Sequence, residues 1–252
     1  NWKGKPTTHH PAPSPFGIPY RSLYSRNIEN LFMAGRNISV THAALSATRV
    51  MATCSVIGQA VGTAAAIAVA HGLTPRGVYQ HKLAELQQQL MEDDAWLPWH
   101  ERAIPELSRR ARLSASDGDP EPLRNGIDRP IDDEDNGWRG PLGAWVEYSF
   151  GEPTRVSEAR LVFDSDLNRG WRNMLANYPL NLEPRTVPSC MVKAFRIEGK
   201  RGDEGYRTLA RVENNYQRLV RVPLAAEVDA VRFVAEETWG SSDVHLFAFD
   251  VR

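Results

Sequence analysis

The sequence predicts an α/β segment followed by an all-β sandwich. Within residues 30–72 a short apolar strand, a glycine, a polar turn and a long helix of small residues follow one another. Beyond residue 144 the hydrophobic pattern changes to alternation with period two, which is typical of half-buried strands. We therefore expect a first domain over residues 1–112 and a second over residues 113–252.

The composition is typical of a globular protein and excludes some classes of partner. Of the 252 residues, 42% are hydrophobic and 24% are charged, and the formal net charge is -1. A chain so close to neutral has no electrostatic attraction to nucleic acid or to an anionic membrane, so we expect neither partner. Cys54 and Cys190 are far apart and lack metal-type spacing, so no metal site is expected and the cellular compartment stays open.

The opening residues 1–20 are rich in proline, which predicts an extended segment and not a helix. His9 and His10 lie in this segment, and without further ligands nearby we interpret them as loop residues and not as metal ligands. The first six residues read like the middle of a longer chain, and no signal-peptide pattern is present. We therefore expect a fragment or a processed product.

The helix expected over 50–71 has two interpretations. Residues 50–70 carry no formal charge and reach the length of a membrane span. However, Ala, Gly, Thr and Ser dominate the segment, and Gly58 and Gly62 give it a smooth face that another backbone can approach closely. We therefore expect a buried helix that packs against a sheet, and not a membrane span.

A second, amphipathic helix is expected over 74–94, because Thr74 is a good N-cap and Pro75 fits the first helical position. Residues 106–144 are polar and predict a linker with the opening loops of the second domain. Six short strands then indicate an antiparallel β-sandwich. They are expected at 144–150, 159–163, 191–197, 218–222, 230–235 and 244–251. The long interval 164–188 is expected to be a functional or covering loop.

The strand expected over 31–34 ends at Gly35, and a polar turn over 36–41 connects it to the helix. Such an arrangement gives an anionic ligand access to backbone N–H groups and to the positive end of a helix. The same arrangement is common in proteins that bind nothing there. The residues by themselves therefore leave a ligand site and a structural turn equally open.

Three segments of the first domain resemble the C-terminal flavin-binding segment of FAD-dependent oxidoreductases, in particular those of a bacterial group distantly similar to the fumarate reductase flavoproteins. These segments are 30–37 (NLFMAGRN), 48–53 (TRVMAT) and 58–65 (GQAVGTAA). Residues 19–24 (PYRSLY) fit the same group, and the match covers about residues 16–75. The resemblance implies FAD as the cofactor and hydride transfer to or from the flavin as the chemistry.

The resemblance also implies a set of site residues. The loop after Gly35 would lie near the FAD pyrophosphate, and the helix N-terminus would stabilise negative charge on the reduced flavin. The implied cofactor-binding residues are Ala34, Gly35, Arg36, Asn37, Thr48, Arg49, Val50, Met51 and Thr53. His42 is either an acid/base or substrate contact beside the flavin or a hydrogen-bonded structural histidine. For Cys54, an inert buried cysteine is preferred over a redox or flavin-linking thiol.

One element of this family is absent from the sequence. The dinucleotide-binding GxGxxG that follows a strand does not occur, and Gly58 and Gly62 do not replace it. We therefore expect the rest of the FAD-binding Rossmann part upstream or on a second chain. By itself, this polypeptide is expected to bind FAD weakly or not at all, and an oligomer is compatible with the sequence.

The second domain resembles, more weakly, the galactose-binding-like or discoidin jelly roll that is appended to carbohydrate-active enzymes. The resemblance rests on 125–128 (NGID), 145–151 (WVEYSFG), 156–161 (VSEARL), 195–197 (FRI) and 230–233 (AVRF). It implies either a sugar site with loop aromatics or a domain that only packs. The aromatic candidates are Trp138, Trp171, Tyr178 and Trp239. The acidic residues Asp132, Asp133, Glu134 and Asp135 could ligate calcium, but a solvated acidic loop is the preferred interpretation.

The leading hypothesis from the sequence is the C-terminal portion of an FAD-dependent oxidoreductase. Its saccharide-related substrate is an expectation by analogy with the second domain only. The alternative is a non-catalytic carbohydrate-binding or interaction module, in which residues 16–112 only support the sandwich.

Overall fold

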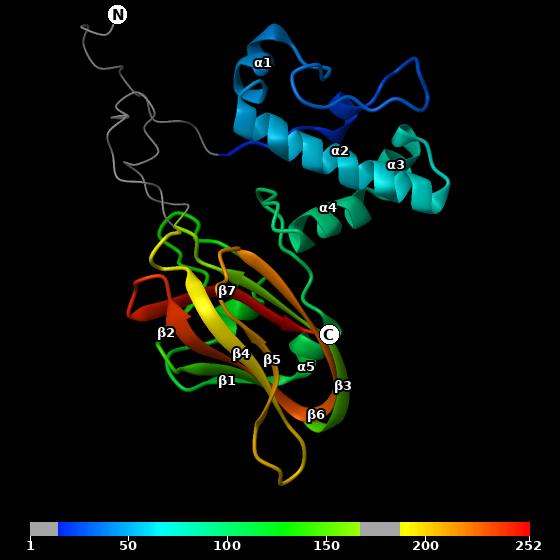
Figure 1. Cartoon of the computed structure of the whole chain (residues 1–252). Helices are drawn as coiled ribbons and strands as arrows, with labels where there is room; N and C mark the ends of the chain where they lie inside the picture. Colours follow the sequence, from blue (N-terminus) through cyan, green and yellow to red (C-terminus); the bar gives the residue numbers. More distant parts are fainter. Residues whose placement is uncertain (1–14, 167–186) are drawn as a thin grey trace, which may run out of the picture. The chain divides into compact units, whose positions relative to one another are not determined.

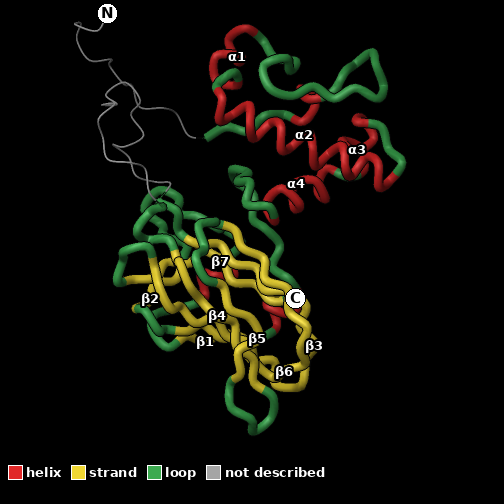
Figure 2. The backbone as a smooth tube through the Cα atoms, viewed as in Figure 1, coloured by secondary structure: helices red, strands yellow, loops and turns green. Residues whose placement is uncertain are grey.

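The computed structural model of the chain describes residues 15–166 and 187–252. These residues form two compact units, one that ends at Arg102 and one that begins at Ala103 (Figure 1). The first unit is helical and the second consists mainly of strands (Figure 2). The domain boundary expected at residue 112 stays a prediction.

The helical unit contains a 3-10 turn and four α-helices. They are η1 (Tyr20–Leu23), α1 (His42–Thr48), α2 (Met51–His71), α3 (Pro75–His81) and α4 (Leu83–Glu92). The predicted N-cap of α3 is confirmed, since the Thr74 side chain accepts a hydrogen bond from the Gly77 amide at 3.1 Å. The helix expected over 74–94 is wrong as a single element, because the backbone leaves helical geometry at Lys82, with φ -134°.

The strand expected over 31–34 is also wrong. This segment makes only an isolated antiparallel bridge, between Phe32 and Tyr24. A strand needs a neighbour to satisfy its backbone groups, and in the described part of this unit the only neighbour is the short segment after η1. Helix α1, which follows the polar turn, was not expected from the sequence.

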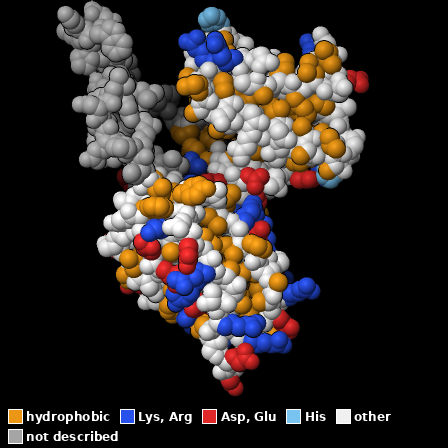
Figure 3. Space-filling view, viewed as in Figure 1, with side chains coloured by type: hydrophobic (Ala, Val, Ile, Leu, Met, Phe, Trp, Pro, Cys, Tyr) orange, Lys and Arg blue, Asp and Glu red, His pale blue; other side chains and the backbone are white. Residues whose placement is uncertain are grey.

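Helix α2 begins within one residue of its predicted start and ends at its predicted end, but it is not buried against a sheet. Only Ile57, Ala64, Ile67 and Ala68 of its 21 residues are buried, and they pack with α3 and α4. The described part of this unit contains no sheet that could cover the other side. By length and composition α2 is the one described helix that could cross a membrane. Apolar side chains accordingly lie on the visible surface of this unit (Figure 3).

The second unit contains seven strands with short helices at its start. They are α5 (Glu106–Arg110), β1 (Arg112–Ala115), η2 (Glu121–Arg124), β2 (Trp138–Pro141), β3 (Trp145–Phe163), β4 (Val192–Lys200), β5 (Arg207–Val212), β6 (Leu219–Thr238) and β7 (Asp243–Val251). All strand pairings are antiparallel, as the sequence predicts.

Two long strands connect the layers of the sandwich. β3 covers the predicted strands 144–150 and 159–163 except residue 144, and β6 covers the predicted strands 218–222 and 230–235 except residue 218. Their pairing shifts register twice, between Ser149 and Thr154 and between Val156 and Glu158, so both strands bend there. The first half of β3 pairs with β1 and the second half pairs with β7. One layer therefore holds β1, β4 and β5, and the other holds β2 and β7.

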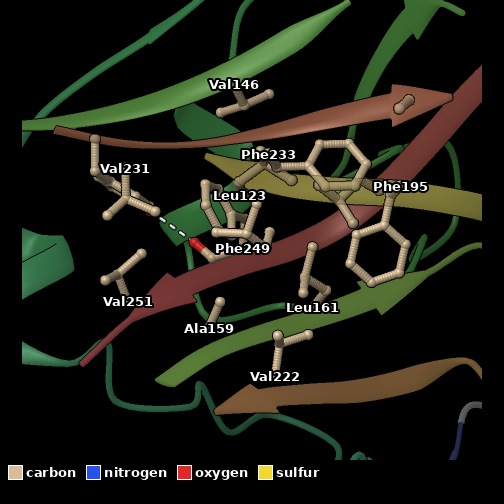
Figure 4. Packing of buried hydrophobic residues seen from close by; sticks show 14 of the residues in the cluster. Leu123, Val146, Ala159, Leu161, Phe195, Val222, Val231, Phe233, Phe249 and Val251 are labelled. Carbon is tan, nitrogen blue, oxygen red and sulfur yellow. Dashed lines mark hydrogen bonds between the residues drawn. The ribbon is translucent and has the colours of Figure 1, made fainter. Parts of the chain in front are cut away.

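The sandwich core lies between these layers and is rich in aromatic side chains (Figure 4). The rings of Phe163, Phe195 and Phe233 pack with centroids 5.2–6.1 Å apart. Tyr148 is fully buried and donates its hydroxyl proton to the carbonyl oxygen of Phe249 at 2.8 Å, which satisfies the polar end of the ring.

Candidate functional site

The first part of the candidate site is the turn at Gly35. The glycine has φ +75°, a left-handed conformation that side chains other than Asn and Asp rarely adopt. A Cβ atom at this position would meet only the Asn37 side-chain oxygen, at 3.9 Å, so the space beside the turn is open. The backbone conformation, and not crowding, therefore requires glycine here.

The second part of the site is the junction between α1 and α2. Helix α1 ends at Thr48, and Arg49 separates it from Val50, the N-cap of α2. The hydroxyl group of Thr48 donates to the Ala44 carbonyl oxygen at 3.2 Å. The thiol group of Cys54 lies 3.4 Å from the Thr48 carbonyl oxygen and joins the first turn of α2 to the end of α1.

The N-terminus of α2 carries an uncompensated positive end. Val50 provides no side-chain hydrogen bond to the first turn, and the first turn contains no acidic residue. The side chains of Val50 and Met51 are 51% and 90% exposed, so the helix end is open to a ligand. A 21-residue helix with such an end attracts an anion.

The implied cofactor-binding residues are distributed over both parts of the site. Arg36, Asn37, Arg49, Val50 and Met51 are exposed. Ala34, Gly35 and Thr53 are partly buried, and Thr48 is buried. Residues 48–53 lie together at the junction, and the turn shares one hydrophobic cluster with α2 through Ile38 and Ile57.

His42 is the first residue of α1 and is exposed. Its ring has no hydrogen-bond partner among the described residues, so nothing there gives it a structural role. The side chain is therefore available to a ligand, and its role in catalysis stays a prediction.

Two of the four aromatic side chains predicted as sugar contacts lie among the described residues. Trp138 is wrong as a sugar contact, because it is 1% exposed and donates its indole N–H to the Asp117 carbonyl oxygen at 2.7 Å. The alternation of β2 points it into the core. Trp239 lies in the loop after β6 and is 39% exposed. Trp171 and Tyr178, together with the loop 164–188 except at its ends, lie outside the described residues, as do His9 and His10.

The acidic residues 132–135 form a turn, and one of them is engaged in ion pairs. The carboxylate of Asp135 lies 2.9 Å from the Arg139 guanidinium and 3.2 Å from Nε2 of His245. Within residues 15–166 and 187–252 no group of three His, Cys, Asp or Glu side chains is arranged to hold a metal ion.

Two residues of interest were missed from the sequence. Tyr216 is 69% exposed in the loop between β5 and β6, next to Asn215, which accepts the indole N–H of Trp239. His245 is buried between two carboxylates. A single side chain in a loop or a strand gives no periodic signal in the sequence. These two residues can therefore be recognised only from the fold.

Comparison with known proteins matches both parts of the chain. Residues 2–90 match the family described as FAD dependent oxidoreductase. No curated protein matches the sequence.

Carbohydrate-binding modules are among the solved structures similar to the chain. One is the family 32 carbohydrate-binding module from Streptococcus pneumoniae EndoD, at 12% identity and TM-score 0.43, over 58% of this chain and 97% of that one. A Clostridium perfringens module in complex with GalNAc-β-1,3-galactose has 10% identity and TM-score 0.40, over 57% and 96%. Chitosan-binding module 2 of Paenibacillus sp. IK-5, in complex with chitotriose, has 12% identity and TM-score 0.41, over 58% and 98%.

Proposed function

We propose that this chain, with residues 2–90 that match the FAD dependent oxidoreductase family, is the C-terminal portion of such an enzyme. It contributes a loop and a helix N-terminus to the flavin site, and the enzyme acts on a saccharide-related substrate. The observation that carries the proposal is the open, uncapped N-terminus of α2 inside the matched segment.

The residues present fit an anionic cofactor. The pyrophosphate of FAD and the reduced flavin ring are both negative, and the first turn of α2 offers backbone N–H groups without a competing carboxylate. Arg36 and Arg49 have exposed cationic side chains, Arg36 in the turn before α1 and Arg49 directly after α1. In this proposal they hold the phosphate groups, and the glycine turn allows close approach of the backbone.

When bound, FAD supplies the acceptor or donor of a hydride. The chain supplies orientation and charge stabilisation through the end of α2. In this proposal His42 holds or accepts a proton at an imidazole nitrogen; the support is that its ring is exposed and has no partner among the described residues.

The exposed side of α2 fits the Rossmann part that this proposal requires. Met51, Gly58, Gly62 and Val69 recur at helical spacing on one exposed face. Cβ atoms added at the two glycines would meet nothing within 4 Å. Since the sequence lacks GxGxxG, we propose that an α/β partner with this motif packs on the face and completes the FAD site.

A pair of substitutions at one position tests the flavin site. In the complete protein, Met51→Glu places a carboxylate at the first residue of α2, and Met51→Gln is its neutral match. A carboxylate at a helix N-terminus stabilises the helix, so the variant folds, but it repels an anionic cofactor. We expect Met51→Glu to weaken FAD binding about tenfold, which corresponds to about 1.4 kcal/mol, while Met51→Gln changes it less than about twofold. Equal FAD affinity in the two variants would contradict the proposal.

A second function is supported by the loops of the sandwich. Tyr216 and Trp239 are both exposed, and the Trp239 indole binds the backbone of Asn215, the residue before Tyr216. The ammonium group of Lys193 lies 5.3 Å from the Trp239 ring centroid. Aromatic faces beside polar groups bind the apolar faces and hydroxyl groups of sugars. We propose that these residues bind a saccharide.

A glycan panel with titration calorimetry tests the saccharide site. Trp239→Ala should reduce affinity about fivefold to tenfold, since a stacked aromatic contributes about 1–1.5 kcal/mol. Trp99→Ala, which removes an exposed tryptophan of the helical unit, is the matched control and should change nothing. Failure of the wild-type chain to bind any glycan would refute this second function and leave the flavin proposal untouched.

A further inference from the structure

A buried imidazole lies between two carboxylates at the end of the sandwich where β7 begins. His245 is 2% exposed, and its Nδ1 atom lies 2.8 Å from Oδ2 of Asp164, just after β3. Its Nε2 atom lies 3.2 Å from Oδ1 of Asp135, in the loop before β2. The ring packs edge-on against Phe247, with centroids 4.3 Å apart. Two loops that are distant in sequence therefore meet at one ring.

The contact with Asp164 fixes one proton on the ring. Burial by itself would raise the pKa of Asp164, but hydrogen bonds from His245 and from the Asp166 amide lower it below the usual value. An ionised carboxylate only accepts hydrogen bonds, so Nδ1 of His245 must carry the donated proton. Whether Nε2 also carries a proton then decides the charge of the ring.

The Nε2 atom is buried and has no aligned hydrogen bond with the described residues. The Asp135 carboxylate lies within ion-pair distance of it, at 3.2 Å. On a neutral ring, Nε2 presents a lone pair to this carboxylate, and the contact is repulsive. On an imidazolium, Nε2 presents an N–H with positive charge, and the contact is attractive. The sign of this contact therefore depends on the second proton.

The loop backbone covers Nε2 closely. A Cβ atom at Gly137 would lie 2.5 Å from Nε2 of His245 and 3.0 Å from the carbonyl oxygen of Leu246. Only glycine allows the chain to pass here. The His245 ring therefore packs directly against the backbone at Gly137, two residues after Asp135.

We propose that His245 is a proton-dependent clamp, which holds residues 135–137 against β7 when its ring carries two protons and releases them when Nε2 loses its proton. Asp164 remains bound in both states, because its partner is Nδ1. The clamp sits at the end of the sandwich that carries the loop with Trp239, since that loop leads directly into β7. Protonation thus regulates loop order at this end, whether or not a saccharide binds there.

Other charged groups near the His245 ring do not change the sign of the interaction between Nε2 and the Asp135 carboxylate. Arg139 is the direct cross-strand neighbour of His245 on β2, and its guanidinium is paired with Asp135. In the loop just before β6, Arg218 lies over the Phe247 ring, with its guanidinium carbon 5.2 Å from the ring centroid. Cys190, near Asp164, stays uncharged because burial raises the pKa of its thiol to about 11.

Nuclear magnetic resonance on the full chain tests the clamp. The His245 ring nitrogens report its protonation, and amide exchange at Asn136 and Gly137 reports the loop. Asp135→Asn removes the carboxylate that faces Nε2, and Asp133→Asn, at an exposed position of the same turn, is the matched control. We expect the ring of Asp135→Asn to titrate at a pH lower by about half a unit or more, and that of Asp133→Asn to titrate as in the wild type.

The loop readout separates a clamp from a static ion pair. In the wild type, amide exchange at Asn136 and Gly137, corrected for intrinsic rates, should rise about threefold or more as the His245 ring loses its second proton. In Asp135→Asn this step should be absent. The inference is overturned if Asp135→Asn leaves the ring titration unchanged, or if loop exchange does not follow the ring titration in the wild type.

Discussion

The indole N–H of Trp239 donates to the backbone carbonyl oxygen of Asn215 at 2.6 Å, which joins the loop after β6 to the loop before it. The side chain of Asn215 is buried and holds its own loop. Its amide donates to the carbonyl oxygens of Val192 and Gln217, at 2.9 and 3.0 Å, and its oxygen accepts the Gln217 amide. The exposed rings of Tyr216 and Trp239 therefore extend from loops that the hydrogen bonds of Asn215 hold in place.

We expect Asn215→Ala to lower the free energy of unfolding by about 2 kcal/mol, because the buried carbonyl oxygen of Val192 and the partly buried backbone groups of Gln217 lose this partner. Denaturant unfolding followed by tryptophan fluorescence measures the change. Asn214→Gly is the control, since Asn214 has φ +55° and glycine adopts this conformation freely. A loss for Asn215→Ala no larger than that of the control would show that the loop does not depend on this side chain.

The ion pair between Arg160 and Asp250 offers a second test. These residues are directly opposite on β3 and β7, both are fully buried, and their side chains approach to 3.4 Å. Arg160 also lies 2.9 Å from the Asp128 carboxylate. We expect Arg160→Met to destabilise the sandwich by about 3–5 kcal/mol, because buried carboxylates lose their counter-charge.

The double variant Arg160→Met/Asp250→Leu should lose less than the sum of its two single variants, because it removes both members of the pair. Thermal unfolding of the three variants gives this comparison. Additive losses would mean that the two charges do not depend on each other.

The sequence predicts the parts of the fold that depend on local pattern. Thr74 and Pro75 indicate the start of α3, and small residues without charge indicate α2 from Val50 onward. Alternation indicates the strand segments of the sandwich. Each of these signals is a spacing of residues within one element.

Features that depend on partners could not be predicted in this way. Phe32 belongs to an apolar run, but a strand forms only beside another strand, and the described part of the unit has none to offer. The predicted burial of α2 failed for the same reason. The sequence indicates a loop aromatic at Trp138 because the four-residue strand β2 is too short to be recognised from its pattern, and its pairing with β7 places the side chain in the core.

Glycine substitutions on α2 test the proposed docking face. Gly58 lies in the helix interior with open space around it, so Gly58→Ala should stabilise the chain by about 0.5–1 kcal/mol. The larger Gly58→Leu should fold as well but should prevent close packing of the Rossmann partner, and flavin content of the complete protein should fall. Circular dichroism and flavin absorbance measure the two effects. Full flavin content in Gly58→Leu would exclude this face as the contact.

The lowered pKa of Asp164 predicts that the free energy of unfolding of the sandwich falls in acid. Its folded-state pKa lies below the ordinary value of 3.8, because hydrogen bonds from His245 and Asp166 outweigh burial. A lowered pKa contributes stability that is present above the unfolded value and is lost as pH falls through the folded value. Asp164→Asn should therefore flatten the decline in unfolding free energy below about pH 4. Denaturant unfolding between neutral pH and acid measures it, and an unchanged slope would contradict this assignment.

The most direct test of the flavin proposal is the visible absorption spectrum of the complete protein from its natural host, recorded after gel filtration together with the intact mass of every chain. We expect an oxidised-flavin band that co-elutes with this sequence and with a segment or second chain that carries GxGxxG. A preparation that contains such a Rossmann part but no flavin, and that takes up none when FAD is added, would contradict the proposal.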